Sequence, residues 1–196
     1  MNTRAATITP HTMTSETAQI LAALTQQQQT LEMIQKQLHQ PPLGFSDAVG
    51  IVYVFCNRQH GSLWYRLDAN GDPIAICHTA LTGYLTSLEF PRVERRNKEV
   101  IKLQATIKAD TTYVLEAGYE SQFAKGLLSA IAHLTPEELK QPITVVPQAG
   151  EDDKVLFCRV FHDGEFVRAH YDDTTDWRRV AATALSSVKV AIGSDR

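Results

Sequence analysis

A glycine interrupts the most strand-like segment of the chain, and it limits how that segment can fold. The stretch LTGYLTSLEF carries Leu81, Leu85 and Leu88 together with Tyr84 and Phe90, which is typical of a β-strand, but Gly83 stands near its start. A glycine inside a strand leaves nothing to pack there. It usually marks a bulge, a sharp bend or the close approach of another backbone. We therefore expect one of these irregularities at Gly83, within a strand over residues 80–92.

Four more strands and a helix follow this strand. Residues 92–98, RVERRNK, predict a basic turn. In the next strand Lys102, Gln104, Thr106 and Lys108 alternate with apolar residues, so one face is expected to be buried and the other wet. The remaining elements are predicted as a strand at 111–119, a helix at 121–134 capped by Ser121, and strands at 141–148 and 154–161.

The order strand, strand, strand, helix, strand, strand resembles OB-fold single-stranded DNA-binding proteins, with no specific member identified. The resemblance spans residues 80 to about 169. It implies a small, partly open five-stranded barrel. It also implies that Gly83 lets the first strand bend to serve both halves of the barrel, and that the helix at 121–134 plugs the barrel bottom. The predicted fold class is mainly β with α, a five-stranded OB-fold-like barrel with flanking elements.

The flanking elements are an N-terminal helix, an extra N-terminal hairpin and a C-terminal helix. Residues 1–13 are polar and expected to be disordered. Residues 14–40 carry the heptad pattern of a short coiled coil; packing on the chain's own globular domain and self-association are both open. Residues 48–196 form the predicted OB-fold-like domain, with a hairpin turn at Asn70-Gly71 and a helix at about 175–191. The heptad positions are Thr17, Ile20, Leu24, Gln27, Leu31, Ile34 and Leu38.

Cations for phosphates and flat rings for bases are what a protein needs to hold a single strand without reading its sequence. Tyr84 and Tyr113 supply rings on the first and third predicted strands, and Trp64, Tyr65 and Phe90 are further candidates. Each stacked base is worth about 1–3 kcal/mol. The competing interpretation is that these rings belong to the core and that the cations are merely solvated. The clustered cations are Arg92, Arg95, Arg96, Lys98, Lys102 and Lys108.

Composition narrows the class of protein. The chain of 196 residues is 43% hydrophobic and 21% charged, with a formal net charge of -3. That charge argues against a globally basic nucleic-acid binder but leaves room for a local basic groove. Three cysteines, an odd number, suit reduced thiols in the cytoplasm. We see no secretory signal and no apolar run long enough to span a bilayer, so we expect a cytoplasmic protein without a membrane partner.

A zinc site is the one metal hypothesis that the sequence raises. Cys56, His60, Cys77 and His78 are ligand types that zinc accepts. However, adjacent residues of a strand point to opposite faces, so Cys77 and His78 do not converge easily, and buried structural cysteines are the favoured interpretation. No phosphate-binding glycine loop, nucleophile elbow or paired-carboxylate motif is present. We expect no enzyme, no cofactor and no metal.

The expected function is sequence-tolerant binding of single-stranded DNA through a basic, aromatic OB groove, serving replication, recombination or repair. RNA is an alternative ligand, because a stacking groove need not exclude the 2′-OH. The N-terminal helix is expected to join copies of the chain into a homo-oligomer. A rival from another class is an OB-like protein–protein adaptor or assembly subunit without nucleic-acid binding, which the net acidity favours.

Overall fold

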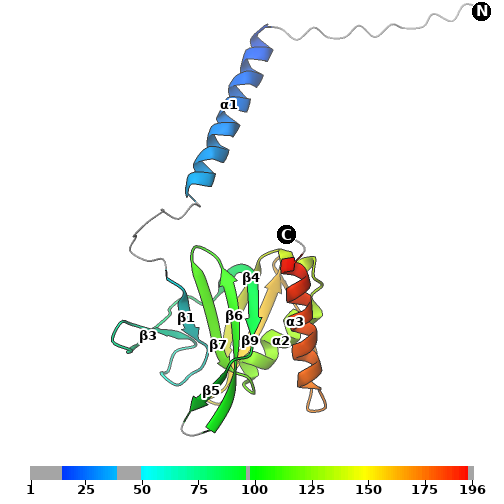
Figure 1. The fold of residues 1–196 in the computed structure, drawn as a ribbon. Coiled ribbons are helices and arrows are strands. Elements are labelled where there is room, and N and C mark those ends of the chain that lie inside the picture. The colour runs from blue at the N-terminus through cyan, green and yellow to red at the C-terminus, as the bar shows by residue number, and fades with distance from the viewer. Residues whose placement is uncertain (1–14, 39–49, 96–97, 194–196) are drawn as a thin grey trace, which may run out of the picture. The chain divides into compact units, whose positions relative to one another are not determined.

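The computed structural model of the chain describes residues 15–38, 50–95 and 98–193. The chain divides into two units, Met1–Ala48 and Val49–Arg196. In the first unit, the predicted helix is present as α1, Ser15–Leu38 (Figure 1). The expected disorder of residues 1–13 lies outside the described residues. Of the helices in the described segments, none combines the length and apolar character that a membrane crossing needs.

The second unit is mostly β with helices, as predicted. Among its described residues, ten strands form one open sheet, in the order β10-β9-β8-β4-β6-β7-β1-β2-β3, with β5 paired to β6. The strands are β1 Val52–Phe55, β2 Tyr65–Leu67, β3 Pro73–Ala75, β4 Leu81–Glu89, β5 Arg92–Arg95, β6 Lys98–Lys108, β7 Thr112–Gly118, β8 Ile143–Ala149, β9 Leu156–His162 and β10 Glu165–Phe166.

Strand β4 changes its neighbour part-way along. Its first three residues pair with β8, and residues from Tyr84 onward pair with β6. The register on β6 shifts between Leu85 and Ser87. A Cβ atom at Gly83 would lie 2.6 Å from the carbonyl oxygen of Lys108, so the two backbones approach closely there. The irregularity expected at Gly83 is confirmed, and its cause is this close approach.

The predicted five-stranded barrel is replaced by a wider, open sheet. The outer edge of β7 is occupied by β1, which pairs with it in parallel from Val52 opposite Tyr113 to Phe55 opposite Glu116. Strand β9 pairs with β8 and β10. A barrel of the predicted kind would close by pairing β7 with β9. A strand has one row of hydrogen-bonding groups on each side, and β1 occupies the side of β7 that this closure would need.

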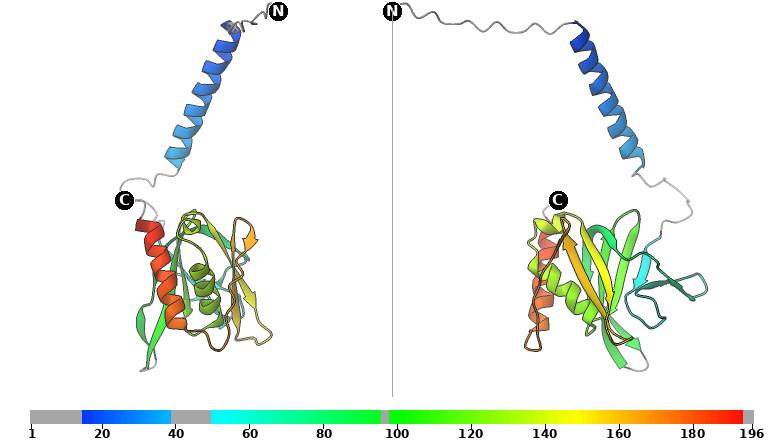
Figure 2. Two further views of the ribbon diagram at one scale, coloured as in Figure 1. Left: turned by 90° about the vertical axis from the view of Figure 1, so that its right-hand side faces the viewer. Right: turned by 180° about the vertical axis from the view of Figure 1, so that it is seen from behind.

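Two helices pack together against the sheet (Figures 1 and 2). Helix α2, Gln122–His133, begins where the Ser121 side chain accepts a hydrogen bond from the Ala124 backbone N–H at 3.2 Å, as predicted. A short 3-10 turn, η1, spans Glu138–Lys140, and helix α3 spans Trp177–Gly193. Phe123 and the apolar side chains that follow it at helical spacing are fully buried. They form the core between the sheet and α3.

The basic turn predicted at residues 92–98 is instead a two-stranded ribbon. Strand β5 pairs with the start of β6 from Arg92 opposite Ile101 to Arg95 opposite Lys98. The pairing continues through residues assigned to the turn because the β-branched Val93 and Val100 face each other across the two strands. The hairpin predicted around Asn70-Gly71 is present as β2 and β3.

Candidate nucleic-acid interface

One face of the central sheet carries the polar side chains of β6. Leu103, Ala105 and Ile107 are buried, and the residues between them point the other way. The pairing register extends that face onto both neighbours: Tyr84 of β4 lies opposite Lys108, and Glu116 of β7 lies opposite Gln104. We call it the outer sheet face, made of Tyr53, Phe55, Tyr65, Tyr84, Lys102, Gln104, Thr106, Lys108 and Glu116.

Aromatic rings lie at both sides of the outer sheet face. Tyr84 and Tyr53 are 50% and 45% exposed. Phe55 and Tyr65 stack with ring centroids 5.3 Å apart and planes inclined by 21°, and the His60 ring meets Tyr65 edge-on at 4.7 Å. Exposed rings cost free energy in water unless they are covered, so Tyr84 and Tyr53 are positions where a flat partner can stack. Phe55 is half-buried, and Tyr65 is only 6% exposed, so the Tyr65 ring is already covered by its neighbours.

The cations of this face differ in how freely they are presented. Lys102 Nζ lies 3.3 Å from Glu116 Oε1, and the two side chains are only 17% and 16% exposed. Gln104 Nε2 donates to the other oxygen of Glu116 at 3.0 Å. Lys108 is exposed and makes no ion pair within the described part of the chain. Lys108 lies six residues along β6 from Lys102, which places the two lysines about 20 Å apart.

The β5–β6 ribbon holds the other predicted cations. Arg92 pairs with Glu99 at 3.5 Å, and both side chains are well exposed, so solvent screens this contact. Lys98 is exposed at the start of β6. The side chain of Arg95 and all of Arg96 lie outside the described residues, so their predicted role is neither supported nor opposed.

Three of the predicted rings belong to the core side rather than to the outer sheet face. Tyr113 lies opposite the buried Ile107, and burial, followed by a hydrogen bond to Asp110, raises the pKa of its hydroxyl. Trp64 is buried and donates from Nε1 to the His78 carbonyl oxygen at 2.7 Å. Phe90 is half-buried and packs edge-on against Tyr119. The placement of Tyr113 near the cations was wrong because the alternation along β7 sends its ring inward.

Tyr53 and Phe55 were missed as candidate rings. Both lie on β1, beside Val114 and Glu116 of β7. Valines alternate with aromatic residues along β1, and both kinds of side chain are apolar. The sequence of β1 therefore does not indicate which of the two faces water. The signal that finds them is the parallel pairing of β1 with β7, which only the structure reveals.

A cavity of about 370 Å³ opens beside these rings, between β1–β2 and the β5–β6 ribbon. We call it the ribbon pocket. Its lining combines a ring platform, two side-chain amides, an imidazole, one lysine and two carboxylates. These residues are Phe55, Tyr65, Asn57, Gln59, His60, Lys102, Glu94 and Glu116, with Leu67 and Val93 completing the wall.

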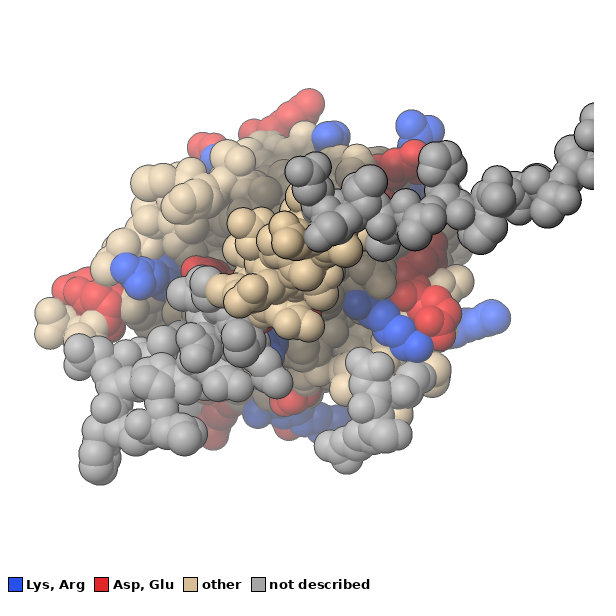
Figure 3. Space-filling model, turned by 90° about the horizontal axis from the view of Figure 1, so that it is seen from above, with Lys and Arg blue, Asp and Glu red and all other residues tan. Residues whose placement is uncertain are grey.

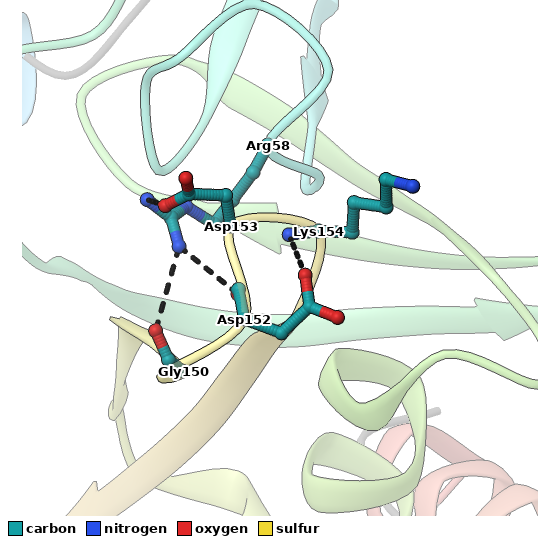
Figure 4. A network of polar contacts seen from close by, with 5 residues as sticks. All are labelled: Arg58, Gly150, Asp152, Asp153 and Lys154. Carbon is teal, nitrogen blue, oxygen red and sulfur yellow. Dashed lines mark hydrogen bonds and ion pairs between the residues drawn. The ribbon is translucent and has the colours of Figure 1, made fainter.

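The loop between β1 and β2 is tied to the loop between β8 and β9 (Figure 4). The Arg58 guanidinium donates to the Asp152 carbonyl oxygen at 3.2 Å and to that of Gly150 at 3.5 Å, and pairs with Asp153 at 3.3 Å. The Arg58 side chain is 16% exposed. This contact connects the β1–β2 segment to the β9 side of the sheet, where no strand pairing links them in the described residues.

Charge is mixed on the side of the molecule that Figure 3 draws. Lys and Arg are interspersed there with Asp and Glu, so no broad field of one sign is visible on that side. Attraction for phosphate on that side therefore depends on individual cations.

The zinc hypothesis lacks a geometric basis among the described residues. Cys56 is buried in the core, whereas His60, Cys77 and His78 are exposed. The described segments contain no group of three or more His, Cys, Asp or Glu side chains placed to hold a metal ion.

Comparisons of the chain with protein-family models, with curated proteins and with solved structures give no match.

Proposed function

We propose that the outer sheet face binds single-stranded DNA with little dependence on sequence. The observation that carries the proposal is the exposed Tyr84 ring of β4, which lies opposite the exposed Lys108 of β6. On the other side of the face, β1 adds the exposed Tyr53 and the half-buried Phe55. A single strand offers unpaired bases for the rings and phosphates for the lysines. A duplex keeps its bases stacked inside and offers only the phosphates, so it is the weaker ligand.

An OB-like arrangement is the second part of the proposal. Strand β4 is shared between β6 and β8, and helix α2 lies between the third and fourth strands of the core, β7 and β8. These features support an OB-like core that β1 has opened by pairing with β7. The added strand β1 brings the exposed Tyr53 and the half-buried Phe55 to the face that such a core uses for its ligand.

Self-association through α1 completes the proposal, and the partner is a second copy of the chain. Ile20, Leu24 and Leu31 are all more than half exposed on the described part of the helix. Between residues 18 and 32 the only charged residue is Glu32, so little like-charge repulsion opposes a second identical helix. Joining two DNA-binding units raises avidity along a strand.

The experiment is a fluorescence-anisotropy titration of a labelled oligothymidine at low and moderate salt, with a duplex of equal length alongside. The proposal expects binding that favours the single strand and weakens as salt rises. An oligouridine of the same length distinguishes RNA from DNA as the preferred ligand. Absence of binding at micromolar protein in low salt contradicts the proposal.

A protein–protein adaptor is the second candidate. Glu116 neutralises Lys102, and the β8–β9 loop presents the exposed carboxylates of Glu151, Asp152 and Asp153. Both features lower the attraction for a polyanion and suit a partner protein with a basic surface. The same titration separates the two candidates, because an adaptor leaves the oligothymidine free.

A further inference from the structure

A second group of aromatic rings lies on β9 and β10, on the far side of β8 from the cations of β6. Phe157 and Phe166 are 39% and 45% exposed, and Phe161 is half-buried. The ring centroids of Phe161 and Phe166 are 5.7 Å apart, and the Arg159 guanidinium lies 5.8 Å from the centroid of the Phe166 ring. We call this group the β9–β10 patch, made of Phe157, Arg159, Phe161 and Phe166.

The alternation along β9 turns the patch away from the core. Leu156 and Val160 are buried among the core side chains, and the patch residues of β9 are the ones that alternate with them. The contacts of the Phe166 ring with Arg159 and Phe161 place it on the same side of the strand pair. The rings of the patch are therefore presented on the outer side of the sheet.

Strand pairing connects the patch with the Tyr84 ring of the outer sheet face. Phe161 lies opposite Thr144 of β8, and Thr144 lies opposite Thr82 of β4, two residues before Tyr84. The hydroxyl oxygens of Thr82 and Thr144 are 2.8 Å apart in a hydrogen bond. Three strand spacings, about 14 Å, separate β4 from β10. Because neighbouring strands are twisted relative to one another, the outer side turns over this span, and a ligand that reaches the patch follows it.

The patch offers a nucleic acid the same two kinds of contact as the outer sheet face. Its exposed rings accept stacked bases, and Arg159 makes no ion pair within the described segments, so its charge is available to a phosphate. A cavity of about 480 Å³ opens beside Phe157, Arg159 and Phe166, which leaves room for a flat group. Glu151 lines the same cavity, so we expect stacking to contribute more than charge at the patch.

We infer that the β9–β10 patch holds a second stretch of the single strand bound at the outer sheet face. The preferred ligand is then a strand long enough to cover both places. Bases of this second stretch stack on Phe157 and Phe166, and Arg159 contacts a phosphate between them. A short strand occupies the outer sheet face alone and gains nothing from the patch. This inference rests on the proposed function and extends its site from β4 to the edge of the sheet at β10.

The test compares labelled oligothymidines of about 6 and about 16 nucleotides, both within the range of site sizes known for OB folds. Anisotropy gives their affinities for the wild type and for Phe157→Ala with Phe166→Ala. The matched control is Ile74→Ala with Ile192→Ala, which removes two apolar side chains, 39% and 43% exposed, from β3 and α3. Circular dichroism checks that each variant is folded.

A second variant, Arg159→Gln, tests the patch without removing a ring. Its control is Arg179→Gln, which removes one exposed arginine from α3. If Arg159 contacts a phosphate of the long strand, the slope of log affinity against log salt falls by about 0.7, and the control keeps the wild-type slope.

The expected result is at least about fivefold weaker binding of the long strand by the double phenylalanine variant, the lower end of what the loss of one stacked base gives. The short strand and both controls keep the wild-type affinity. Unchanged binding of the long strand by both patch variants overturns the inference, leaves the proposed function intact and points to a protein partner for these rings. An equal loss for the short strand also overturns it. If neither strand binds the wild type, the proposed function and the inference fall together.

Discussion

Lys102 and Glu116 form an ion pair of 3.3 Å on the outer sheet face, with each side chain less than a fifth exposed. Lys102 belongs to β6 and Glu116 to β7, and Gln104 holds the second oxygen of the carboxylate. A carboxylate in this position reduces the positive charge that Lys102 offers to a ligand. The pair therefore sets how strongly this end of the face attracts a phosphate.

Glu116→Gln is expected to strengthen binding of oligothymidine and to steepen its salt dependence. The amide can still contact Gln104 and Lys102 but no longer neutralises the lysine. If Lys102 gains one phosphate contact, the slope of log affinity against log salt grows by about 0.7. Anisotropy titrations at several salt concentrations measure this slope. An unchanged slope would place Lys102 outside the binding surface.

Gly83→Ala is expected to lower the free energy of unfolding by about 1–3 kcal/mol, because the new Cβ would overlap the Lys108 carbonyl oxygen at 2.6 Å. Urea unfolding followed by circular dichroism measures the change. Gly118→Ala is the matched control: it lies on β7, with no atom within 4 Å of the added Cβ. Equal effects of the two substitutions would mean that β4 does not need a glycine at its change of neighbour.

Leu24→Glu with Leu31→Glu is expected to convert an oligomer of the chain into single chains. Both leucines lie on the heptad stripe of α1, where a second helix would bring two pairs of carboxylates together. Light scattering after size-exclusion chromatography gives the mass of the particle. Ala22→Glu with Gln29→Glu, on the opposite side of the helix, should keep the oligomer. A wild-type chain that already runs as a single copy refutes self-association through α1.

Two thiols, the buried Cys56 and the half-buried Cys158, are expected to make the protein less stable in alkaline solution. Burial raises the pKa of Cys56, with Cys158 and Glu116 adding to the effect, and burial raises the pKa of Cys158. In the unfolded chain a thiol titrates near pH 8.5. The stabilisation is therefore fully present below about pH 8.5 and is lost as the pH rises toward the folded-state pKa.

Urea unfolding between about pH 7 and pH 10 tests this expectation for the wild type and for Cys56→Ala with Cys158→Ala. The double variant is less stable throughout, because it leaves cavities in the core, but its decline with pH should be shallower. Cys77→Ala removes an exposed thiol and is the control that keeps the wild-type slope. Identical slopes in all three proteins would contradict the assignment of the effect to Cys56 and Cys158.

Local patterns in the sequence predicted the elements of the second unit better than their assembly. Gly83, the cap at Ser121 and the alternation along β6 each act within a few residues, so their consequences are visible in the sequence. The pairing of β1 with β7 joins segments about 60 residues apart in the chain. Both faces of β1 are apolar, so nothing local indicates which edge it pairs with.

The candidate site was predicted in part for the same reason. Lys102 and Lys108 were placed on one wet face by the period of two, and Tyr84 joins them through the register of β4. Tyr113 was misplaced because Val114, an apolar residue, occupies the outer side of β7 beside Tyr53. Val114 is buried on that side because β1 lies beside it. The sequence of β7 alone therefore does not reveal on which side of the strand Tyr113 lies.

The measurement that tests the account most directly is the salt dependence of oligothymidine binding by Lys102→Gln with Lys108→Gln. The control is Arg179→Gln with Lys189→Gln, which removes the same charge from exposed positions of α3. If the outer sheet face holds the strand, the first variant binds more weakly and its salt slope falls by about 0.7 for the contact of the unpaired Lys108, whereas the control keeps the wild-type slope. Equal loss in both variants, or none in either, would contradict binding at this face.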